Sequence, residues 1–325
     1  MHRYLSSALA EAERTTNFLE EWTMQGAELG EHGEILRLIG LDALMAESAG
    51  RPEITVGLVD GPVRMDHPSL ETGSLRSLGP GPSDACSGRG PACDHGTFIA
   101  GILAAKRSFD APGVCPGCTV MIRPIFADGA PGLPGATATE LAAAIVACVD
   151  GGARIINLSV AVRHAAGRGR QELTAALDHA AKREVVIVAA AGNDGAVAGS
   201  AVTLHPWVLP VIAYDRRGGL LGYSNLTRSI GQRGVGAPGD PLLGLGVEGA
   251  RRTPGGTSAA AAFVTGAAAL LWSLSPRASG SALRQALGPA AGARVALVPR
   301  LFDARAARRR LFEAVGWKTS QGQGA

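Results

Sequence analysis

Aromatic side chains are scarce in this chain of 325 residues and make up only 4% of it. Glycine is abundant, with 45 residues, and alanine runs are frequent, so the core must close through small side chains and close backbone approach. That composition favours stacked layers of helix and sheet. With 46% hydrophobic residues, the chain is long enough for one large or two ordinary domains and can bury a sizeable core.

A broad basic face and a membrane-spanning run are also missing from the sequence. The formal net charge is only +3, and much of the positive excess lies in the segment "RAARRRL" near the C-terminus, which argues against a nucleic-acid partner. No run reaches the 18 apolar residues of a membrane helix, and acidic residues interrupt the N-terminal stretch where a signal peptide needs its apolar core. We therefore expect a cytoplasmic protein with no membrane partner.

The five cysteines allow more than one interpretation. Cys86, Cys93, Cys115 and Cys118 fit reduced thiols, local disulfides, or four thiolate ligands for a structural zinc ion, and their spacing alone does not separate these alternatives. Cys148 falls on the apolar face of a predicted helix and is expected to be a small core residue.

Apolar runs of strand length alternate with helical patterns along the chain. The strands are expected at residues 54–60, 120–126, 154–160, 185–191 and 207–213, and the helices between them at 95–106, 137–152 and 170–184. The strand runs are continuous rather than alternating, as is typical of strands buried on both faces. The pattern predicts an α/β fold of three layers, with a mostly parallel sheet and helices on both of its faces.

The organisation along the chain is expected to have three parts. Residues 1–35 are polar and rich in glutamate and predict a helical N-terminal extension. Residues 36–299 hold the strands and helices of the main domain. Residues 300–325 predict a short basic helix followed by a flexible tail.

Four polar residues stand where a parallel sheet concentrates function. Asp60 ends the first strand and Asn193 follows the fourth, and active groups gather beyond the carboxyl ends of such strands. His95 and Ser258 supply a base and a nucleophile, which serine hydrolysis needs together with a carboxylate that orients the imidazole. We predict Asp60, His95 and Ser258 as catalytic residues. The Asn193 amide and the Ser258 backbone N–H are predicted to stabilise the oxyanion.

Each of these residues also has an ordinary structural interpretation. Ser258 alone fits a helix N-cap, Asp60 and Asn193 fit turn residues, and His95 fits a surface or capping histidine. Their occurrence together, at strand ends and helix starts, favours a single site. A separate glycine pattern at 244–249 matches a dinucleotide-binding fingerprint, but proline and more glycine follow it instead of a helix, so we interpret it as a loop.

Five segments carry a family resemblance: "GLVDGPV", "HGTFIAG", "INLS", "AAAGNDG" and "GGTSAAAAFVTGAAALL". In this order, over roughly residues 50–275, they resemble the signature blocks of the subtilisin-like serine proteases. The resemblance implies a subtilisin-like fold, a serine endopeptidase, Asp60, His95 and Ser258 as its triad and Asn193 as its oxyanion donor. It also implies that the backbone after the third strand pairs with substrate, so that the substrate-binding residues are Ser159, Val160, Ala161 and Gly192.

The resemblance implies no required cofactor and no identifiable metal site. Structural calcium is common in the family, yet no acidic loop of this chain identifies ligands for it. Three residues after the serine depart from the family pattern, since Ala259, Ala262 and Phe263 stand where many subtilases have Met, Pro and His. These departures put rate and specificity in question, and they leave every essential group in place.

A narrower resemblance concerns the substrate. The segments "GLVDGPV" and "PIFADG" are similar to proteases of cyanobactin biosynthesis, which cut leader segments from ribosomally made peptides. This implies a peptide or protein substrate, in particular a precursor peptide. The alternatives are a general intracellular protease of the subtilisin type and a catalytically weak fold that acts as a peptide-binding module.

Overall fold

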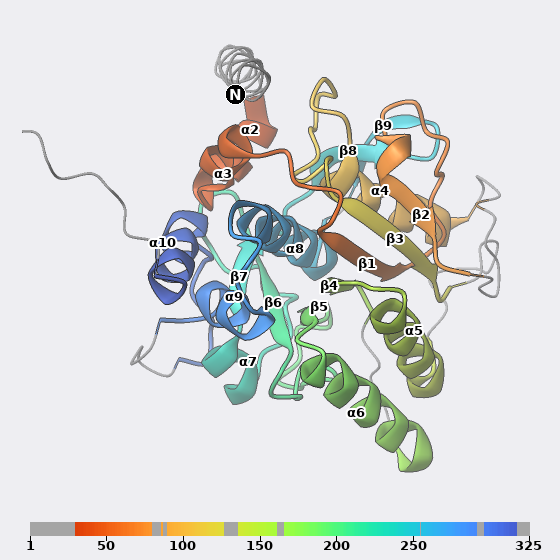
Figure 1. Cartoon of the computed structure of the whole chain (residues 1–325), viewed down its shortest axis with the longest axis vertical. Helices are drawn as coiled ribbons and strands as arrows, with labels where there is room; N and C mark the ends of the chain where they lie inside the picture. The colour runs from red at the N-terminus through yellow and green to blue at the C-terminus, as the bar shows by residue number, and fades with distance from the viewer. Residues whose placement is uncertain are drawn as a thin grey trace, which may run out of the picture.

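The computed structural model describes residues 30–79, 86, 90–126, 136–160, 166–253, 255–290 and 296–316. Within these ranges the central sheet has seven strands, all paired in parallel, in the order β2-β3-β1-β4-β5-β6-β7 (Figure 1). The strands are β1 Thr55–Asp60, β2 Leu75–Ser77, β3 Thr119–Pro124, β4 Ile155–Leu158, β5 Val186–Ala190, β6 Leu209–Tyr214 and β7 Val235–Pro238. The predicted α/β fold with a mostly parallel sheet is confirmed.

Helices cover both faces of this sheet. The helices α5 (Ala138–Asp150) and α6 (Gly167–Lys182) pack on one face, and α4 (Pro91–Ala104) and α8 (Thr257–Leu274) lie on the other (Figure 1). Leu58 and Val59 show why the strand runs are continuously apolar. Leu58 belongs to the cluster that contains α8, its neighbour Val59 belongs to the cluster that contains α5, and both are fully buried. The three-layer arrangement is confirmed.

Helix α8 is buried along almost its whole length. Its 18 residues are long and apolar enough to cross a membrane by length and composition, but 94% of that window is buried inside the fold. Its small residues allow close packing. A Cβ at Gly266 would lie 2.6 Å from the Val114 side chain, so a larger residue there would force the helix away from its neighbour.

Short helices complete the face around α8. The segment before the sheet forms two helices, α2 (Gly30–Leu38) and α3 (Leu41–Glu47), because Gly40 between them adopts a φ of 69°. At the other end of the chain, α10 (Ala304–Ala314) packs against α9 (Gly280–Leu287) and α3. An ion pair of 2.8 Å between Arg308 and Glu47 joins α10 to α3.

Two parts of the predicted organisation lie largely outside the described residues. These are residues 1–29 of the N-terminal extension and residues 317–325 of the tail. The boundaries at 35 and 299 stay predictions. Both flanking helices nevertheless contribute to the core, since Ile35 and Leu36 of α2 and Leu311 of α10 are buried in the α8 cluster.

The remaining elements differ from the predicted ones in length or position. Helix α4 begins at Pro91, four residues before the predicted start, with Gly90 as its N-cap. The glycine pattern at 244–249 lies in an antiparallel hairpin of β8 (Leu242–Gly246) and β9 (Gly249–Thr253), so it is not the turn from strand to helix that binds dinucleotides. Helix α7 (Arg228–Arg233) precedes β7.

One buried histidine makes the stability of this fold sensitive to acid. His32 of α2 is 5% exposed and lies 6.2 Å from the Phe263 ring, and burial lowers its pKa from 6.5 to about 4. Because the unfolded chain binds this proton more readily, the stability it contributes is complete above pH 6.5 and is lost as the pH falls toward 4. The loss is expected to be about 3 kcal/mol of unfolding free energy.

Urea unfolding at pH 7 and pH 4.5 checks this expectation. His32→Leu should flatten the decline in unfolding free energy between the two pH values relative to the unaltered chain. His179 on α6, whose side chain is 33% exposed, provides the comparison, and His179→Leu should leave the decline unchanged. Equal declines in the unaltered chain and in His32→Leu would contradict the assignment.

Candidate active site

The fold brings Asp60 and His95 together, although they lie 35 residues apart in the chain. Asp60 ends β1 and is fully buried, while His95 lies in the second turn of α4 with 21% of its side chain exposed. The Nδ1 atom of His95 is 2.6 Å from Oδ1 of Asp60, and the backbone N–H of Gly61 donates to the same oxygen. A carboxylate held in this way fixes Nδ1–H as the donor and leaves Nε2 of the imidazole as the basic nitrogen.

The electrostatic environment makes His95 a stronger base. Burial alone would lower its pKa, but the charge of Asp60 and the hydrogen bond to it outweigh burial, so the pKa of His95 is raised above 6.5. The ring therefore becomes neutral, and able to accept a proton, only above that raised value.

Ser258 lies at the start of α8, the helix against which α4 packs. The N-cap of α8 is Gly256, so the alternative that Ser258 is the cap is wrong. Gly255 and Gly256 have φ angles of 77° and 102°, and a Cβ at Gly255 would collide with backbone oxygens of the preceding loop. The structure thus places Ser258 on a helix that packs against the helix of His95. Among the described residues, however, no hydrogen bond joins Ser258 to the His95 ring.

Asn193 follows β5 and is bonded to the same helix start. Its Oδ1 accepts from the backbone N–H of Thr257 at 3.0 Å and from the Thr257 hydroxyl at 2.9 Å. This network orients the amide, because it leaves Nδ2 as the group available for another acceptor. Nδ2 lies 3.2 Å from the position of a Cβ on Gly256, beside the turn that leads to Ser258.

Two supporting residues escaped the sequence interpretation. Thr257 accepts from the backbone N–H of Gly192 in addition to its bonds with Asn193. Asn225 accepts from the backbone N–H groups of Asp194 and Ala196 and so holds the loop that carries Asn193. Their sequence signals were a threonine directly before the serine and the polar segment "SNLT", neither of which is specific.

The predicted substrate-binding residues occupy two strand ends. Ser159 and Val160 follow β4, and Gly192 follows β5, the next strand of the sheet. Ser159 accepts a hydrogen bond of 2.9 Å from Asn157, whose Oδ1 in turn accepts from Thr265 of α8. Ala161 lies outside the described residues. Substrate binding by these residues stays a prediction.

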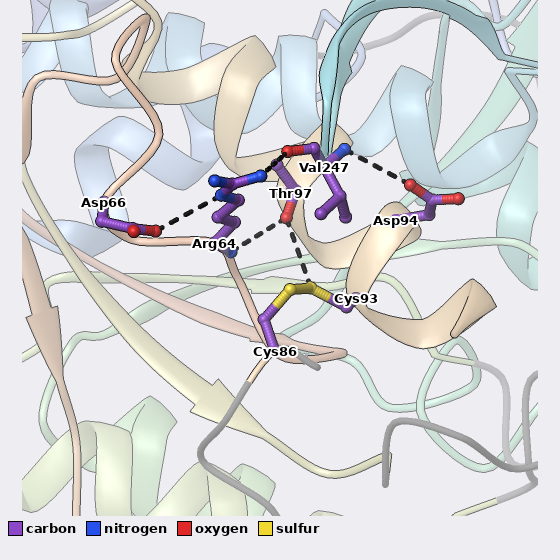
Figure 2. The surroundings of a disulfide bond; sticks show 7 residues. All are labelled: Arg64, Asp66, Cys86, Cys93, Asp94, Thr97 and Val247. Carbon is purple, nitrogen blue, oxygen red and sulfur yellow. Dashed lines mark hydrogen bonds and ion pairs between the residues drawn. A yellow bond between two sulfur atoms is a disulfide. The ribbon is translucent and has the colours of Figure 1, made fainter. Parts of the chain in front are cut away.

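The cysteines divide into a disulfide and buried thiols. Cys86 and Cys93 form a disulfide (Figure 2). The other three cysteines are free and buried: Cys115, Cys118 and Cys148. The four-thiolate zinc site is therefore wrong, because two of its ligands are joined to each other. In the parts of the chain that the structure describes, no group of three or more His, Cys, Asp or Glu side chains is placed to hold a metal ion.

The disulfide lies at the start of the helix that carries His95. Cys93 lies two residues before His95 on α4, and its sulfur is 3.8 Å from the Thr97 hydroxyl, which accepts from the backbone N–H of Arg64 (Figure 2). We expect Cys86→Ser to lower the free energy of unfolding by about 2 kcal/mol, because a short loop is no longer closed in the unfolded chain.

Treatment with a dithiol distinguishes this effect from a local packing defect. It should destabilise the unaltered chain by the same amount and leave Cys86→Ser unchanged, as measured by urea unfolding. A dithiol effect of equal size in both proteins would contradict a stabilising role of the disulfide.

A buried carboxylate that orients a histidine, at the carboxyl edge of a parallel sheet and next to a serine-bearing helix, defines an α/β serine hydrolase. The model of the subtilase family matches residues 51–324, so the chain belongs to that family and is a serine endopeptidase. Its substrates are peptides. The family resemblance inferred from the sequence is confirmed.

Characterised relatives share about a third of the residues. Fervidolysin of Fervidobacterium pennivorans is 31% identical over 293 residues, which cover 81% of this chain and 40% of that protein. Subtilisin DY of Bacillus licheniformis is 28% identical over 260 residues, which cover 78% of this chain and 89% of the relative. The chain thus spans less than half of fervidolysin and most of subtilisin DY.

Similar solved structures include two maturation proteases. The prenylagaramide maturation protease PagA has a TM-score of 0.73 at 30% identity and is covered to 98%, against 84% of this chain. The patellamide maturation protease PatA has a TM-score of 0.68 at 32% identity, with 81% of this chain and 98% of that structure covered. These likenesses confirm the subtilisin-like fold.

Proposed function

We propose that Asp60, His95 and Ser258 are the catalytic residues of this endopeptidase. The contact of 2.6 Å between Asp60 and His95 is the observation that carries the proposal. The Ser258 hydroxyl attacks the substrate carbonyl carbon while Nε2 of His95 accepts its proton. His95 then gives the proton to the leaving amine, the peptide C–N bond breaks, and water releases the acyl group from Ser258 by the same steps.

The oxyanion of the tetrahedral intermediate needs donors aimed at it. Nδ2 of Asn193 and the backbone N–H of Ser258 are the proposed pair, and the orientation of the Asn193 amide by Thr257 supports this role. Helix α8 starts at this point, so its N-terminal dipole favours the same negative charge.

Asn193→Leu removes the proposed donor and keeps an apolar side chain of similar size. We expect kcat to fall by about 10²–10³-fold with little change in KM, a magnitude taken from the oxyanion asparagine of subtilisin itself. Steady-state kinetics on a chromogenic peptide measures it. Asn225→Asp would not serve as a control because the buried Asn225 holds the same loop. Gln171→Leu, at an exposed residue of α6, keeps the site intact and should retain full kcat.

We further propose that the substrate is a ribosomally made peptide precursor from which a leader is cut. The support is the likeness to PagA and PatA, which extends over most of all three chains. The test is incubation with synthetic precursor peptides and mapping of the products by mass spectrometry, with Ser258→Ala as the inactive control. Cleavage at one preferred site supports the proposal. Indiscriminate cutting of casein without a preferred precursor site favours a general protease and would contradict it.

The absence of a required cofactor and the cytoplasmic location stay predictions. Cleavage in the presence of a chelator tests the first. The cytoplasmic location is tested through Cys86 and Cys93, because a reducing compartment disfavours the disulfide between them. Alkylation of the protein in intact cells, followed by mass spectrometry of the 86–93 region, reports which state is present.

A further inference from the structure

A positively charged pocket lies among α7, α9 and α10, on the side of the fold away from the proposed triad. It has a volume of about 480 Å³, and Arg233, Arg284 and Arg310 contribute to its lining. The described residues that line it include no aspartate and no glutamate. Leu209, the first residue of β6, also lines the pocket, which places it at the amino ends of the parallel strands.

Backbone carbonyl groups hold the three arginines in place. The acceptors are the carbonyl oxygens of His205, Val208 and Thr203 for Arg233, of Trp207 and Pro206 for Arg284, and of Ala286 and Gly288 for Arg310. Nη1 of Arg284 and Nη1 of Arg310 donate no hydrogen bond to any described residue. The guanidinium groups are therefore ordered in advance and keep donors for a ligand.

The positive charge of the pocket is poorly compensated. In the described chain no ion pair joins Arg233, Arg284 or Arg310 to a carboxylate. Burial lowers the pKa of all three, and the charge of Arg284 lowers that of Arg233 further. The charges of Asp303, the N-cap of α10, and of Glu313 on α10 raise the pKa of Arg310, and the charge of Arg309 lowers it. One Asp303 oxygen already accepts from the backbone N–H of Ala306. All three guanidinium groups stay charged at neutral pH, so an anion would relieve the repulsion between Arg233 and Arg284.

We propose that this pocket is an exosite that binds an acidic segment of the peptide substrate, an inference that rests on the proposed function. Planar guanidinium groups bind carboxylates through paired hydrogen bonds, and here they are fixed in one pocket. A peptide is the favoured ligand because the chain is an endopeptidase. Arg284 lies over the Trp207 ring with 5.4 Å to its centroid, a contact that further fixes its guanidinium group.

The topology sets how far the acidic segment must lie from the cleaved bond. Strand β6 runs six residues from Leu209 at the pocket to Tyr214 at the catalytic edge of the sheet. Its span is about 17 Å, and a peptide that runs over the surface of the fold needs at least six extended residues to cover it. An acidic segment nearer the cleaved bond than this would not reach the arginines while the bond lies at Ser258.

Binding is tested on the Ser258→Ala protein, which does not cleave its ligand. Fluorescence anisotropy compares a labelled peptide that contains four consecutive glutamates with one that contains glutamines instead. We expect at least tenfold tighter binding of the glutamate peptide, and a loss of about tenfold in each of Arg284→Gln and Arg310→Gln. Arg168→Gln is the matched control, since Arg168 is 91% exposed on α6, and it should change nothing.

Several outcomes would overturn the proposal. The first is equal binding of the two peptides. The second is equal binding of the glutamate peptide by the Arg284→Gln and Arg168→Gln proteins. The third is binding of inorganic pyrophosphate in this pocket by a protein that does not bind the glutamate peptide. Thermal unfolding verifies that each variant is folded. Arg284→Lys, which keeps the charge and loses the paired geometry, should bind with intermediate affinity and supplies a second test if Arg284→Gln unfolds.

Cleavage kinetics separate this proposal from the proposed function. With the active protein, glutamates placed six or more residues from the cleaved bond should lower KM about tenfold, and glutamates placed two residues away should not. Arg284→Gln should abolish that difference and leave the cleavage of a short neutral peptide unchanged. If no peptide is cleaved, the proposed function fails while the anisotropy result still decides the exosite.

Discussion

Ser258→Ala is expected to lower kcat for peptide hydrolysis by about 10⁶-fold, a magnitude taken from the catalytic serine of subtilisin itself. The methyl group cannot attack a carbonyl, and no acyl intermediate forms on it. The fold should be unaffected because Ser258 is not the cap of α8 and makes no hydrogen bond with His95. Steady-state kinetics and thermal unfolding, measured on the same preparation, test both statements.

Covalent labelling sharpens this test. A fluorophosphonate probe should modify the unaltered chain once and should not modify Ser258→Ala. Ser77→Ala on β2, which replaces an exposed serine, is the matched control and should be labelled fully. Labelling of Ser258→Ala at the normal rate, or no labelling of the unaltered folded protein, would contradict the assignment of Ser258. The second result would favour a peptide-binding module on a subtilase fold.

The long strands could be predicted because their sequences determine their environment. The runs in β1, β3, β4, β5 and β6 are β-branched and apolar on both faces, which fits only a covered parallel sheet. Strands β2 and β7 have three and four residues, and β7 contains glycine and proline. Such short segments become strands because a neighbour offers free backbone groups, so their sequences alone do not predict them.

The sequence also predicts the candidate triad, of which the structure joins Asp60 to His95, but it does not predict the residues that support the site. Asp60, His95 and Ser258 form a recognisable set, although each alone fits an ordinary turn or cap residue. Thr257, which begins α8, and Asn225, in a loop, belong to no such set. Thr257 acquires its role only through Asn193, which is 64 residues away. The pairing of Cys86 with Cys93 likewise depends on where α4 begins, because spacing leaves reduced thiols and metal binding equally open.

The departures from the family pattern gain a structural context. Ala259, Ala262 and Phe263 are fully buried in α8, so none of them offers a side chain to a substrate on the surface. Phe263 instead lies against His32 of α2. Their effect on the site must therefore pass through the packing of α8, which sets the position of Ser258 relative to His95.

Asp60→Asn is expected to lower kcat by about 10⁴-fold, the magnitude known for this change in serine protease triads. The buried Asp60 oxygen accepts from both His95 and Gly61, and an amide that turns its NH₂ group toward His95 selects the wrong tautomer.

The charge and hydrogen bond that raise the pKa of His95 would both be lost, leaving burial, which lowers it. Since the base must be neutral, residual activity should reach its plateau at a lower pH than in the unaltered chain. The dependence of kcat/KM on pH measures this shift, and Asp66→Asn, at an aspartate whose side chain is 83% exposed, should reproduce the unaltered profile. An unchanged profile for Asp60→Asn, or a kcat within a few-fold of normal, would show that the short contact between Asp60 and His95 is structural and not catalytic.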